Sequence, residues 1–317
     1  IVVNCKERRR ETRRGILGEF GSGGTSEEVR RNGKIDDEKM LPMGERKAVG
    51  DGLRMLEEVG GVADYKRIFE NHAATVFSKH DPKWHNDTIF ALTNLPTLWI
   101  DREGKRFTNE DIVYDFALWG DTVYQAGGYY YFLIDQALVD HLKEKPLHWT
   151  NSFERTFRLL DGKPMTHQVG PFPNIEDDLK ATIAEGAGFK AASLAELADQ
   201  IGVEKRALEA SVRRYDELVA KKEDTDFYKS SEFMTVPVEK APIYAIRANL
   251  TTLGTVGGGL VNEAFQALTA DRKIIPGVYA IGNDAGGLFD SSYPTIEGLS
   301  NAFAWNSGRI AGRKAAE

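Results

Sequence analysis

The feature that most constrains the fold is the last forty or so residues, where an expected strand, a loop and a helix follow one another. Residues 276–281 read Pro-Gly-Val-Tyr-Ala-Ile, a turn dipeptide followed by a β-branched and aromatic run, and Gly282 marks the strand end. A helix is expected from Leu299 to about Ala315. Because the first N–H groups of a helix have no partner within it and carry positive dipole, this helix would favour an anionic or electron-rich ligand. The chain end therefore predicts a ligand-binding loop.

Four further motifs and the C-terminal string match one family in number and order. The motifs are Gly-Asp-Gly at 50–52, Gly-Lys-Arg-Phe-Thr-Asn-Glu at 104–110, an expected helical pair over 188–218, and Gly-Gly-Gly-Leu at 257–260. The C-terminal string contains Gly-Asn-Asp at 282–284 and Tyr-Pro at 293–294. The sequence resembles FAD-dependent oxidoreductases of the fumarate reductase and 3-ketosteroid dehydrogenase superfamily (FAD-binding domain 2). It is more similar to the ketosteroid dehydrogenase branch, which carries Gly-Asn-Asp and Tyr-Pro at these places.

The resemblance implies an α/β (α+β) fold. In such a fold an α+β cap is inserted into the C-terminal part of a nucleotide-binding flavoprotein sheet. Residues 1–80 and 241–317 are then parts of the FAD-binding domain, and residues 81–240 form the substrate cap. A ligand pocket is expected where the two domains meet.

Local patterns predict several elements of the cap. Residues 98–107 are expected to form a hairpin. Residues 129–134 are expected to form a buried strand, because a sheet core is favoured over an aromatic stacking platform. Ser193 and Glu196 have the spacing of a capping box at a helix start. The next helix has an apolar face expected to pack in the core, formed by Leu208, Val212 and Tyr215.

A dinucleotide-binding fingerprint is the family feature that the sequence does not match. Flavoproteins of this kind hold the ADP half of FAD with a strand, Gly-x-Gly-x-x-Gly and a helix. Residues 21–24, Gly-Ser-Gly-Gly, lack the strand-to-helix context that this fingerprint requires. We therefore expect a partner chain or a missing segment to supply the ADP-binding half, as for a C-terminal portion or truncated variant of a flavoenzyme.

The resemblance also implies which residues contact FAD. Asn283 and Asp284 would lie against the ribityl chain, and Gly257 and Gly258 would let the backbone approach the isoalloxazine closely. Asp51 would shape the flavin pocket or, alternatively, serve as a helix N-cap. Three residues would present backbone N–H groups to the flavin pyrimidine edge, namely Leu299, Ser300 and Asn301.

Two tyrosines stand where ketosteroid dehydrogenases carry catalytic phenols. Tyr114, five residues after Asn109, matches the base that acts on the carbon beside the ketone, and fumarate reductases have an arginine there. Tyr293 matches the tyrosine that donates a hydrogen bond to the substrate ketone. A positioned donor stabilises an enolate oxygen more strongly than the ground-state ketone. The alternative is that both are structural tyrosines with satisfied hydroxyls.

The substrate implied by these residues is a neutral enone or ketosteroid-like ketone. A fumarate-reductase-like enzyme acting on an unsaturated acid needs cations for the carboxylates. Fumarate reductases carry His, Arg, His and Arg at four such positions. This sequence has Gly254, Tyr114, Phe289 and Tyr293 there. Glu297 follows Tyr-Pro where ketosteroid dehydrogenases have glycines. Its carboxylate would repel an enolate if ionised, and the alternatives are that it faces solvent or carries a proton. A further alternative is a non-catalytic flavoprotein fragment that acts as a binding or assembly module.

Composition and charge exclude several other classes. The net charge of −7 argues against nucleic acid as a partner, and no apolar run reaches the roughly 18 residues of a membrane span. The single cysteine, Cys5, excludes an internal disulfide and a cysteine-based metal cluster. His80 and His85 are separated by Pro82 and do not favour a metal site. We expect an acidic cytoplasmic protein without a bound metal.

Overall fold

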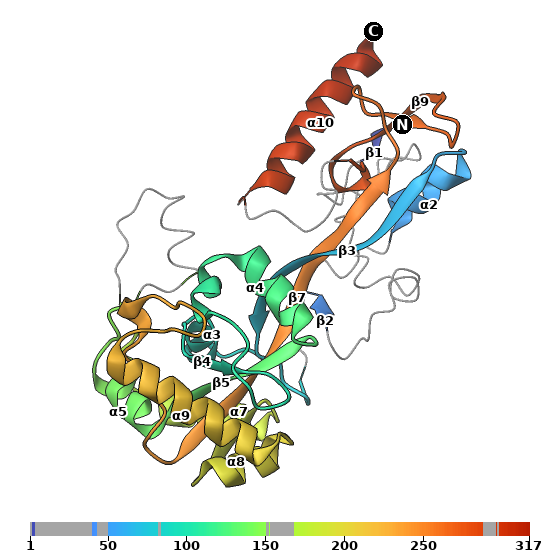
Figure 1. Ribbon diagram of the computed structural model, residues 1–317. Coiled ribbons are helices and arrows are strands. Elements are labelled where there is room, and N and C mark those ends of the chain that lie inside the picture. Colours follow the sequence, from blue (N-terminus) through green and yellow to red (C-terminus); the bar gives the residue numbers. More distant parts are fainter. Residues whose placement is uncertain are drawn as a thin grey trace. The chain divides into compact units, whose positions relative to one another are not determined.

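A computed structural model describes residues 2–3, 40–42, 50–81, 84–149, 152, 168–287, 296 and 298–317 (Figure 1). The chain divides into two compact units. The first consists of Ile1–His72 and Thr251–Glu317, and the second of Ala73–Leu250. The chain passes from one unit to the other within β3 (Ala63–Thr75) and returns within β7 (Ile243–Gly259), and these two strands pair with each other.

An antiparallel sheet forms the centre of the second unit. Its strand β5 (Tyr129–Asp135) pairs with β7 on one side and with β4 (Leu98–Ile100) on the other. β6 (Gly188–Ala191) also pairs antiparallel with β7, and the short β2 (Met40–Pro42) is a further neighbour of β7. Large apolar residues meet across these strands, which is the main source of stability in a sheet of this kind.

Successive residues of β4 and β5 face opposite sides of the sheet, as expected for a pleated strand. Leu98 and Leu133 pack on one side in a buried cluster with residues of α8 and α9. On the other side, the Trp99 ring lies 5.6 Å from that of Trp119 and 4.4 Å from that of Tyr130, between centroids. Tyr130 has no exposed surface, so the prediction of a sheet core over 129–134 is confirmed.

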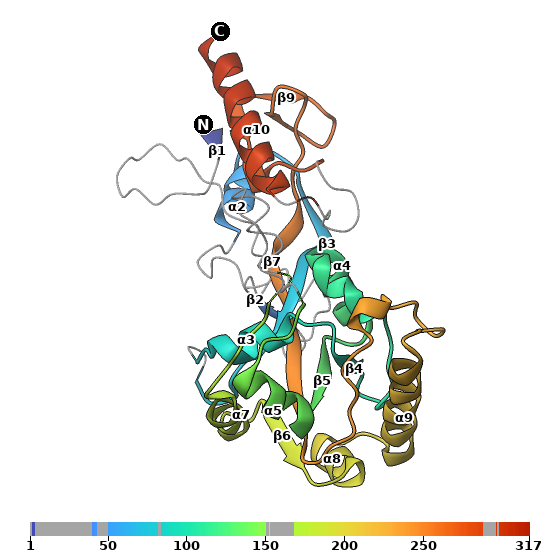
Figure 2. The same ribbon diagram turned by 90° about the vertical axis from the view of Figure 1, so that its left-hand side faces the viewer.

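Helices cover both sides of this sheet. Those of the second unit are α3 (Asp87–Thr93), the 3-10 turn η1 (Glu110–Tyr114), α4 (Phe116–Gln125), α5 (Gln136–Glu144), α7 (Ile175–Ala184), α8 (Leu194–Ile201), α9 (Lys205–Lys221) and the 3-10 turn η2 (Ser231–Phe233). Figures 1 and 2 show α8 and α9 next to each other at one end of the unit.

The start of α8 confirms the predicted Ser193 cap, while the reciprocal bond of Glu196 goes to the residue before the N-cap. The Ser193 hydroxyl accepts a hydrogen bond from the Glu196 N–H at 3.2 Å, and the Glu196 carboxylate accepts one from the Ala192 N–H at 2.9 Å. Gly202 ends the helix with φ of 74°, a conformation that glycine adopts without strain. The predicted apolar face of α9 is also confirmed, since its three residues, Leu208, Val212 and Tyr215, are all buried.

The hairpin expected over 98–107 is wrong in its second arm. The turn forms, because the Asp101 N–H donates to the Lys105 carbonyl at 2.9 Å and Gly104 has a φ of 80°. Residues 105–107 form no strand, however, and β4 pairs with β5 instead. Arg106 leaves the sheet because buried carboxylates bind its guanidinium group.

The first unit contains a small sheet. In it, β9 (Ile274–Ala280) pairs parallel with β1 (Val2–Val3) and antiparallel with β8 (Gln266–Leu268). The 3-10 turn η3 (Gly282–Asp284) follows β9 directly.

Two helices pack on this small sheet. α2 (Asp51–Glu58) contacts it through Leu56, which lies against Ala267 and Val278. α10 (Leu299–Ala316) contacts it through Ala311, which lies in a buried cluster with Tyr279 and Ile281, and Figures 1 and 2 show this helix beside β9. The strand and the helix predicted near the end of the chain are therefore confirmed, as is the α/β (α+β) class.

The core of the second unit can be tested at α9. Leu208→Ala is expected to lower the free energy of unfolding by about 2–5 kcal/mol, because Leu208 has no exposed surface and its removal leaves a cavity. The matched control is Glu209→Ala, at the exposed neighbouring position, for which a change within about 0.5 kcal/mol is expected. Urea denaturation measures both, and equal effects would contradict the assigned packing of α9.

Candidate functional site: a glycine-lined surface in the first unit

The end of β7 and the segment after β9 meet through their backbones. The Gly286 N–H donates to the Gly259 carbonyl at 2.9 Å. A Cβ atom placed on Gly258 would lie 2.6 Å from the Ala285 carbonyl carbon and from the Gly286 nitrogen, closer than side chains approach. Gly258 also has a φ of 146°, which residues with side chains rarely adopt. Glycine is therefore required at this position.

Asp284 lies at the same place. Its side chain is almost completely buried, and a Cβ on Gly52 would lie 2.6 Å from its Oδ2 atom. The helix start of α2 thus abuts the turn η3. Asn283 is half-buried in the same turn, and Gly257 precedes Gly258 in β7. The structure therefore brings these residues into one part of the first unit. We call this part, formed by Gly52, Gly257, Gly258, Asn283 and Asp284, the glycine-lined surface.

Asp51 occupies the first helical position of α2. Its carboxylate forms an ion pair with Arg54 on the partly exposed side of the helix. The N-cap position belongs to Gly50, with a φ of 80°, so the alternative interpretation of Asp51 as an N-cap is wrong. Gly52, which the sequence analysis did not select, makes the close contact with Asp284.

α10 is fixed to the same turn. The Ser307 hydroxyl accepts a hydrogen bond from the Gly282 N–H at 2.9 Å, and both groups are buried. At the helix start, Ser300 is buried and Asn301 is exposed. The Leu299 N–H donates to the Ile296 carbonyl at 3.2 Å, so this group is already used within the turn.

Of the two tyrosines predicted as catalytic, the structure describes Tyr114 but not Tyr293. Tyr114 is the last residue of η1 in the second unit, is half-buried, and has its ring 5.4 Å from that of Phe233. Tyr293 lies outside the described residues, as do Phe289 and Glu297.

A buried ion cluster beside Tyr114 was missed by the sequence analysis. Arg106 donates from Nε to Glu110 Oε1 at 2.9 Å and from Nη2 to Glu110 Oε2 at 2.7 Å. The same Nη2 atom donates to Asp224 Oδ2 at 2.6 Å. The Arg106 side chain is 7% exposed, and neither carboxylate has exposed surface. Arg106 and Glu110 belong to the recognised motif over 104–110, whereas no sequence signal indicates Asp224.

The ion cluster favours the charged forms of Asp224 and Arg106. Burial would by itself raise the pKa of Asp224, but the hydrogen bonds from Arg106 and from backbone N–H groups outweigh it and lower the pKa to about 2. Burial opposes the charge of Arg106 as well, and the two carboxylates nevertheless raise its pKa. Asp224 and Arg106 therefore stay ionised at neutral pH.

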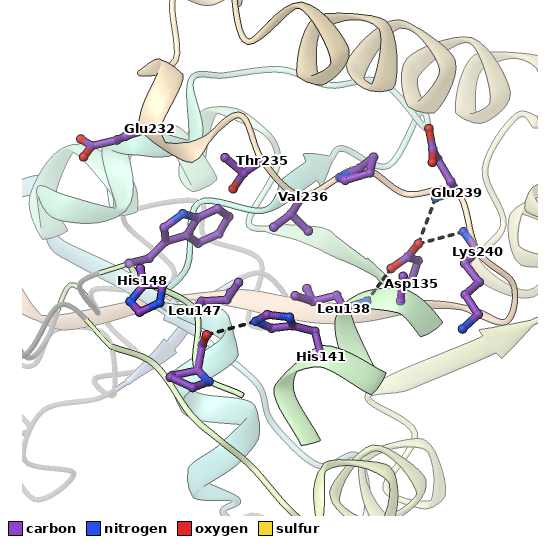
Figure 3. Close-up of a pocket in the computed structure, with 14 residues that line it drawn as sticks. Asp135, Leu138, His141, Leu147, His148, Glu232, Thr235, Val236, Glu239 and Lys240 are labelled. Atoms are coloured by element: carbon purple, nitrogen blue, oxygen red, sulfur yellow. Dashed lines mark hydrogen bonds between the residues drawn. The ribbon is translucent and has the colours of Figure 1, made fainter. Parts of the chain in front are cut away.

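A separate cavity of about 520 Å³ lies in the second unit between α5 and the segments 146–149 and 232–240 (Figure 3). The segments are held by Asp135, which accepts hydrogen bonds from the Glu239 and Lys240 N–H groups, and by His141, whose Nε2 lies 3.0 Å from the Pro146 carbonyl. No residue that the sequence analysis selected as a site residue is among the described residues that line it.

The glycine-lined surface fits the cofactor expected from the sequence. The close packing of Gly52 on Asp284 and of Gly258 on Ala285 and Gly286 holds in place the turn η3, which carries two of the residues that the resemblance assigns to the ribityl chain. Asp284 provides a carboxylate that can accept hydrogen bonds from the hydroxyls of a ribityl chain.

Comparison with known families agrees with this geometry. The sequence profile of the FAD binding domain family matches residues 5–295. The chain belongs to this family, which confirms FAD as the expected cofactor and the superfamily predicted from the motifs.

Two characterised relatives are similar over most of this chain. The vinyl phenol reductase of Lactiplantibacillus plantarum is 26% identical over 288 residues, covering 89% of this chain and 56% of that protein. The cytochrome-type fumarate reductase of Shewanella frigidimarina is 24% identical over 300 residues, covering 94% of this chain and 45% of that protein. The chain thus spans about half the length of these relatives.

A solved structure shares the fold. The 3-ketosteroid Δ1-dehydrogenase of Sterolibacterium denitrificans superposes with a TM-score of 0.65 at 21% identity, covering 95% of this chain and 54% of that one. Within the part of the chain that the structure describes, no helix has the length and apolar character needed to cross a membrane.

The glycine-lined surface can be tested at Gly258. Gly258→Ala is expected to abolish retention of FAD, because the added Cβ would force Ala285 and Gly286 away. The matched control is Gly287→Ala, which has a similarly positive φ of 92° but no atom within 4 Å of the added Cβ. The measurement is the flavin-to-protein absorbance ratio after purification. If Gly287→Ala contains flavin and Gly258→Ala contains as much, the close approach at Gly258 is contradicted.

A buried carboxyl in β3 of the same unit predicts a pH dependence. Glu70 is 2% exposed, and burial raises its pKa from 4.5 to about 8. Between these values the folded chain binds more protons than the unfolded chain, so the free energy of unfolding falls as the pH rises through this range. Glu70→Gln is expected to remove this loss and to be more stable than the parent by on the order of a few kcal/mol near pH 8.

The measurement is urea denaturation at about pH 4 and about pH 8, below and near the top of the range in which Glu70 changes its protonation. The control is Glu58→Gln in the exposed last turn of α2. A stability difference between Glu70→Gln and the parent that is the same at both pH values would show that the folded chain does not hold this proton.

Proposed function

We propose that the chain provides the C-terminal flavin-binding part and the substrate cap of an FAD-dependent oxidoreductase. The enzyme acts on a C–C bond next to a ketone. The observation that carries this proposal is the family match over residues 5–295, which includes both segments of the glycine-lined surface and the whole second unit. FAD, when bound, exchanges a hydride with the substrate carbon.

Tyr114 is the proton-exchanging group in this proposal. Its phenol removes or returns the proton on the carbon beside the ketone. A phenol has an ordinary pKa of about 10, so this role requires the assembled site to lower it. The position of Tyr114 at the end of a short turn that is held by buried charges supports the proposal, because a proton-transfer group must keep a fixed distance from its target.

Tyr293 is the proposed donor to the substrate carbonyl. A phenol O–H that faces the carbonyl oxygen stabilises the negative charge of the enolate as the proton leaves. The proposed flavin contacts are Asn283, Asp284, Gly257 and Gly258, together with Ser300 and Asn301 at the start of α10. Asp51 would shape the same pocket from α2.

A neutral enone or ketosteroid-like compound is the proposed substrate class. Tyr114 stands where the fumarate reductases use an arginine, and Gly254 also replaces a cationic place of that branch. A dicarboxylate would leave charges unpaired in a buried site, which is unfavourable. The similarity to a fumarate reductase keeps an unsaturated acid as a second candidate.

The ADP-binding half of FAD is proposed to be held by polypeptide outside this sequence, either a partner chain or a further segment. The chain spans about half of each characterised relative, which supports this division. If the purified protein contains no flavin and acquires none from added FAD, the alternative of a non-catalytic binding or assembly module gains support over the enzyme.

The catalytic role of Tyr114 can be tested by Tyr114→Phe in the flavin-loaded protein. Loss of the phenol oxygen is expected to lower kcat by about 10²–10⁴-fold on a steroid enone or its saturated ketone, while the flavin spectrum stays unchanged. Tyr293→Phe is expected to lower kcat as well. The control is Tyr228→Phe, at an 82% exposed tyrosine of the same unit. Full turnover in Tyr114→Phe would remove this residue from the mechanism.

A further inference from the structure

η1, which ends at Tyr114, is too short to hold its own shape. It is a five-residue 3-10 turn, Glu110–Tyr114, and such turns depend on contacts from the surrounding structure. Its N-cap is Asn109, whose side chain accepts a hydrogen bond from the Asp111 N–H at 2.8 Å. The first residue of the turn, Glu110, is bound on both carboxylate oxygens by Arg106.

A second buried cation also lies beside Glu110. The Lys229 ammonium has no exposed surface and lies 3.4 Å from Glu110 Oε2. It donates to the Tyr215 hydroxyl at 2.8 Å and to the Pro96 carbonyl. Two cations, Arg106 and Lys229, thus face two carboxylates, those of Glu110 and Asp224, and the four charges balance without help from a substrate.

Aromatic rings restrict the guanidinium group further. The Arg106 Cζ atom lies over the Tyr215 ring at 5.2 Å and over the Phe227 ring at 5.0 Å from the centroids. Both distances fall within the range of cation–π attraction. A planar guanidinium satisfies the two rings and the two carboxylates together, whereas a lysine ammonium lacks the fork geometry.

The segment that carries Asp224 and Lys229 also contacts the rest of η1. The Ser230 N–H donates to Asp111 Oδ2 at 2.7 Å, and the Phe233 ring packs on that of Tyr114. η1 is therefore held at Glu110 by buried charge, at Asp111 by the hydrogen bond from Ser230 to its carboxylate, and at Tyr114 by ring packing. Removing a charge from the cluster would leave its partners buried and unpaired, so the cluster strongly favours one arrangement.

We propose that Arg106, Glu110, Asp224 and Lys229 are positioning residues, whose buried ion cluster fixes the turn that presents the Tyr114 phenol to the substrate. This inference rests on the proposed function. The cluster contacts neither substrate nor flavin in the proposal and acts only through the placement of Tyr114.

The first experiment is steady-state kinetics of Arg106→Lys in the flavin-loaded protein. This variant keeps the charge and loses the fork, so kcat is expected to fall by about tenfold or more while KM changes less. The matched control is Arg214→Lys, which alters an exposed ion pair with Asp226 in the same region and is expected to leave kcat unchanged. Asp224→Asn, which keeps the Arg106–Glu110 pair, serves as a second variant if Arg106→Lys does not fold.

A double-mutant cycle separates positioning from general damage. If the cluster acts through Tyr114, then Arg106→Lys or Asp224→Asn lowers kcat in the parent and has no further effect in Tyr114→Phe. Equal fold-losses in both backgrounds would overturn the proposal.

A measurement that does not depend on turnover uses the chain labelled with ¹³C at the tyrosine Cζ atom. The Tyr114 signal is assigned by its loss in Tyr114→Phe. Its chemical shift and its pH midpoint are expected to change in Arg106→Lys or Asp224→Asn and not in Arg214→Lys, while the Tyr228 signal stays constant. An unchanged Tyr114 signal would refute the positioning role. Full turnover of Tyr114→Phe together with a changed Tyr114 signal would refute the proposed function alone.

Discussion

Backbone contact between the end of β7 and the segment after β9 is the constraint on which the first unit depends. Gly258 lies so close to Ala285 and Gly286 that no side chain fits between them, and the Gly286 N–H is bonded to Gly259. This contact fixes η3, and η3 in turn receives Gly52 from α2 and Ser307 from α10. Three segments distant in sequence are thereby held at one place, where the sequence predicts the flavin contacts. In the second unit one group has a comparable role. The buried guanidinium group of Arg106 joins two segments around η1, because it binds the carboxylates of Glu110 and Asp224.

Much of the fold could be predicted because its local patterns and its packing agree. The run from Tyr129 to Ile134 is apolar and aromatic enough to indicate a buried strand, and the spacing of Ser193 and Glu196 indicates a helix start. Leu208, Val212 and Tyr215 recur at helical spacing and are all buried. In such segments the apolar residues recur with the period of the helix or strand that buries them. The sequence alone is therefore sufficient to predict these elements.

Prediction from the sequence fails where contacts between residues distant in the chain override local structural preference. The run 105–107 has the composition of a strand. It forms none, because the Arg106 guanidinium group binds the carboxylate of Asp224, which lies far along the chain. Nothing in the sequence around Lys229 indicates that its side chain is completely buried, because its partners, Glu110, Tyr215 and the Pro96 carbonyl, lie far along the chain. At the candidate site, the glycines at 257 and 258 were identified by resemblance, whereas the role of Gly52 became evident only from its contact with Asp284.

The pairing of β3 with β7 has a consequence for how such proteins diversify. The whole second unit is one uninterrupted stretch, Ala73–Leu250, whose ends continue into two strands that lie side by side. At this junction the Thr251 hydroxyl donates to the His72 carbonyl at 2.7 Å. A stretch with neighbouring ends can be exchanged as a cassette, since its replacement need only rejoin two adjacent strands. Replacement of the second unit could thus change the substrate specificity while the first unit stays unaltered. A protein engineer could exchange the same stretch by joining the chain at the two unit boundaries, after His72 and before Thr251.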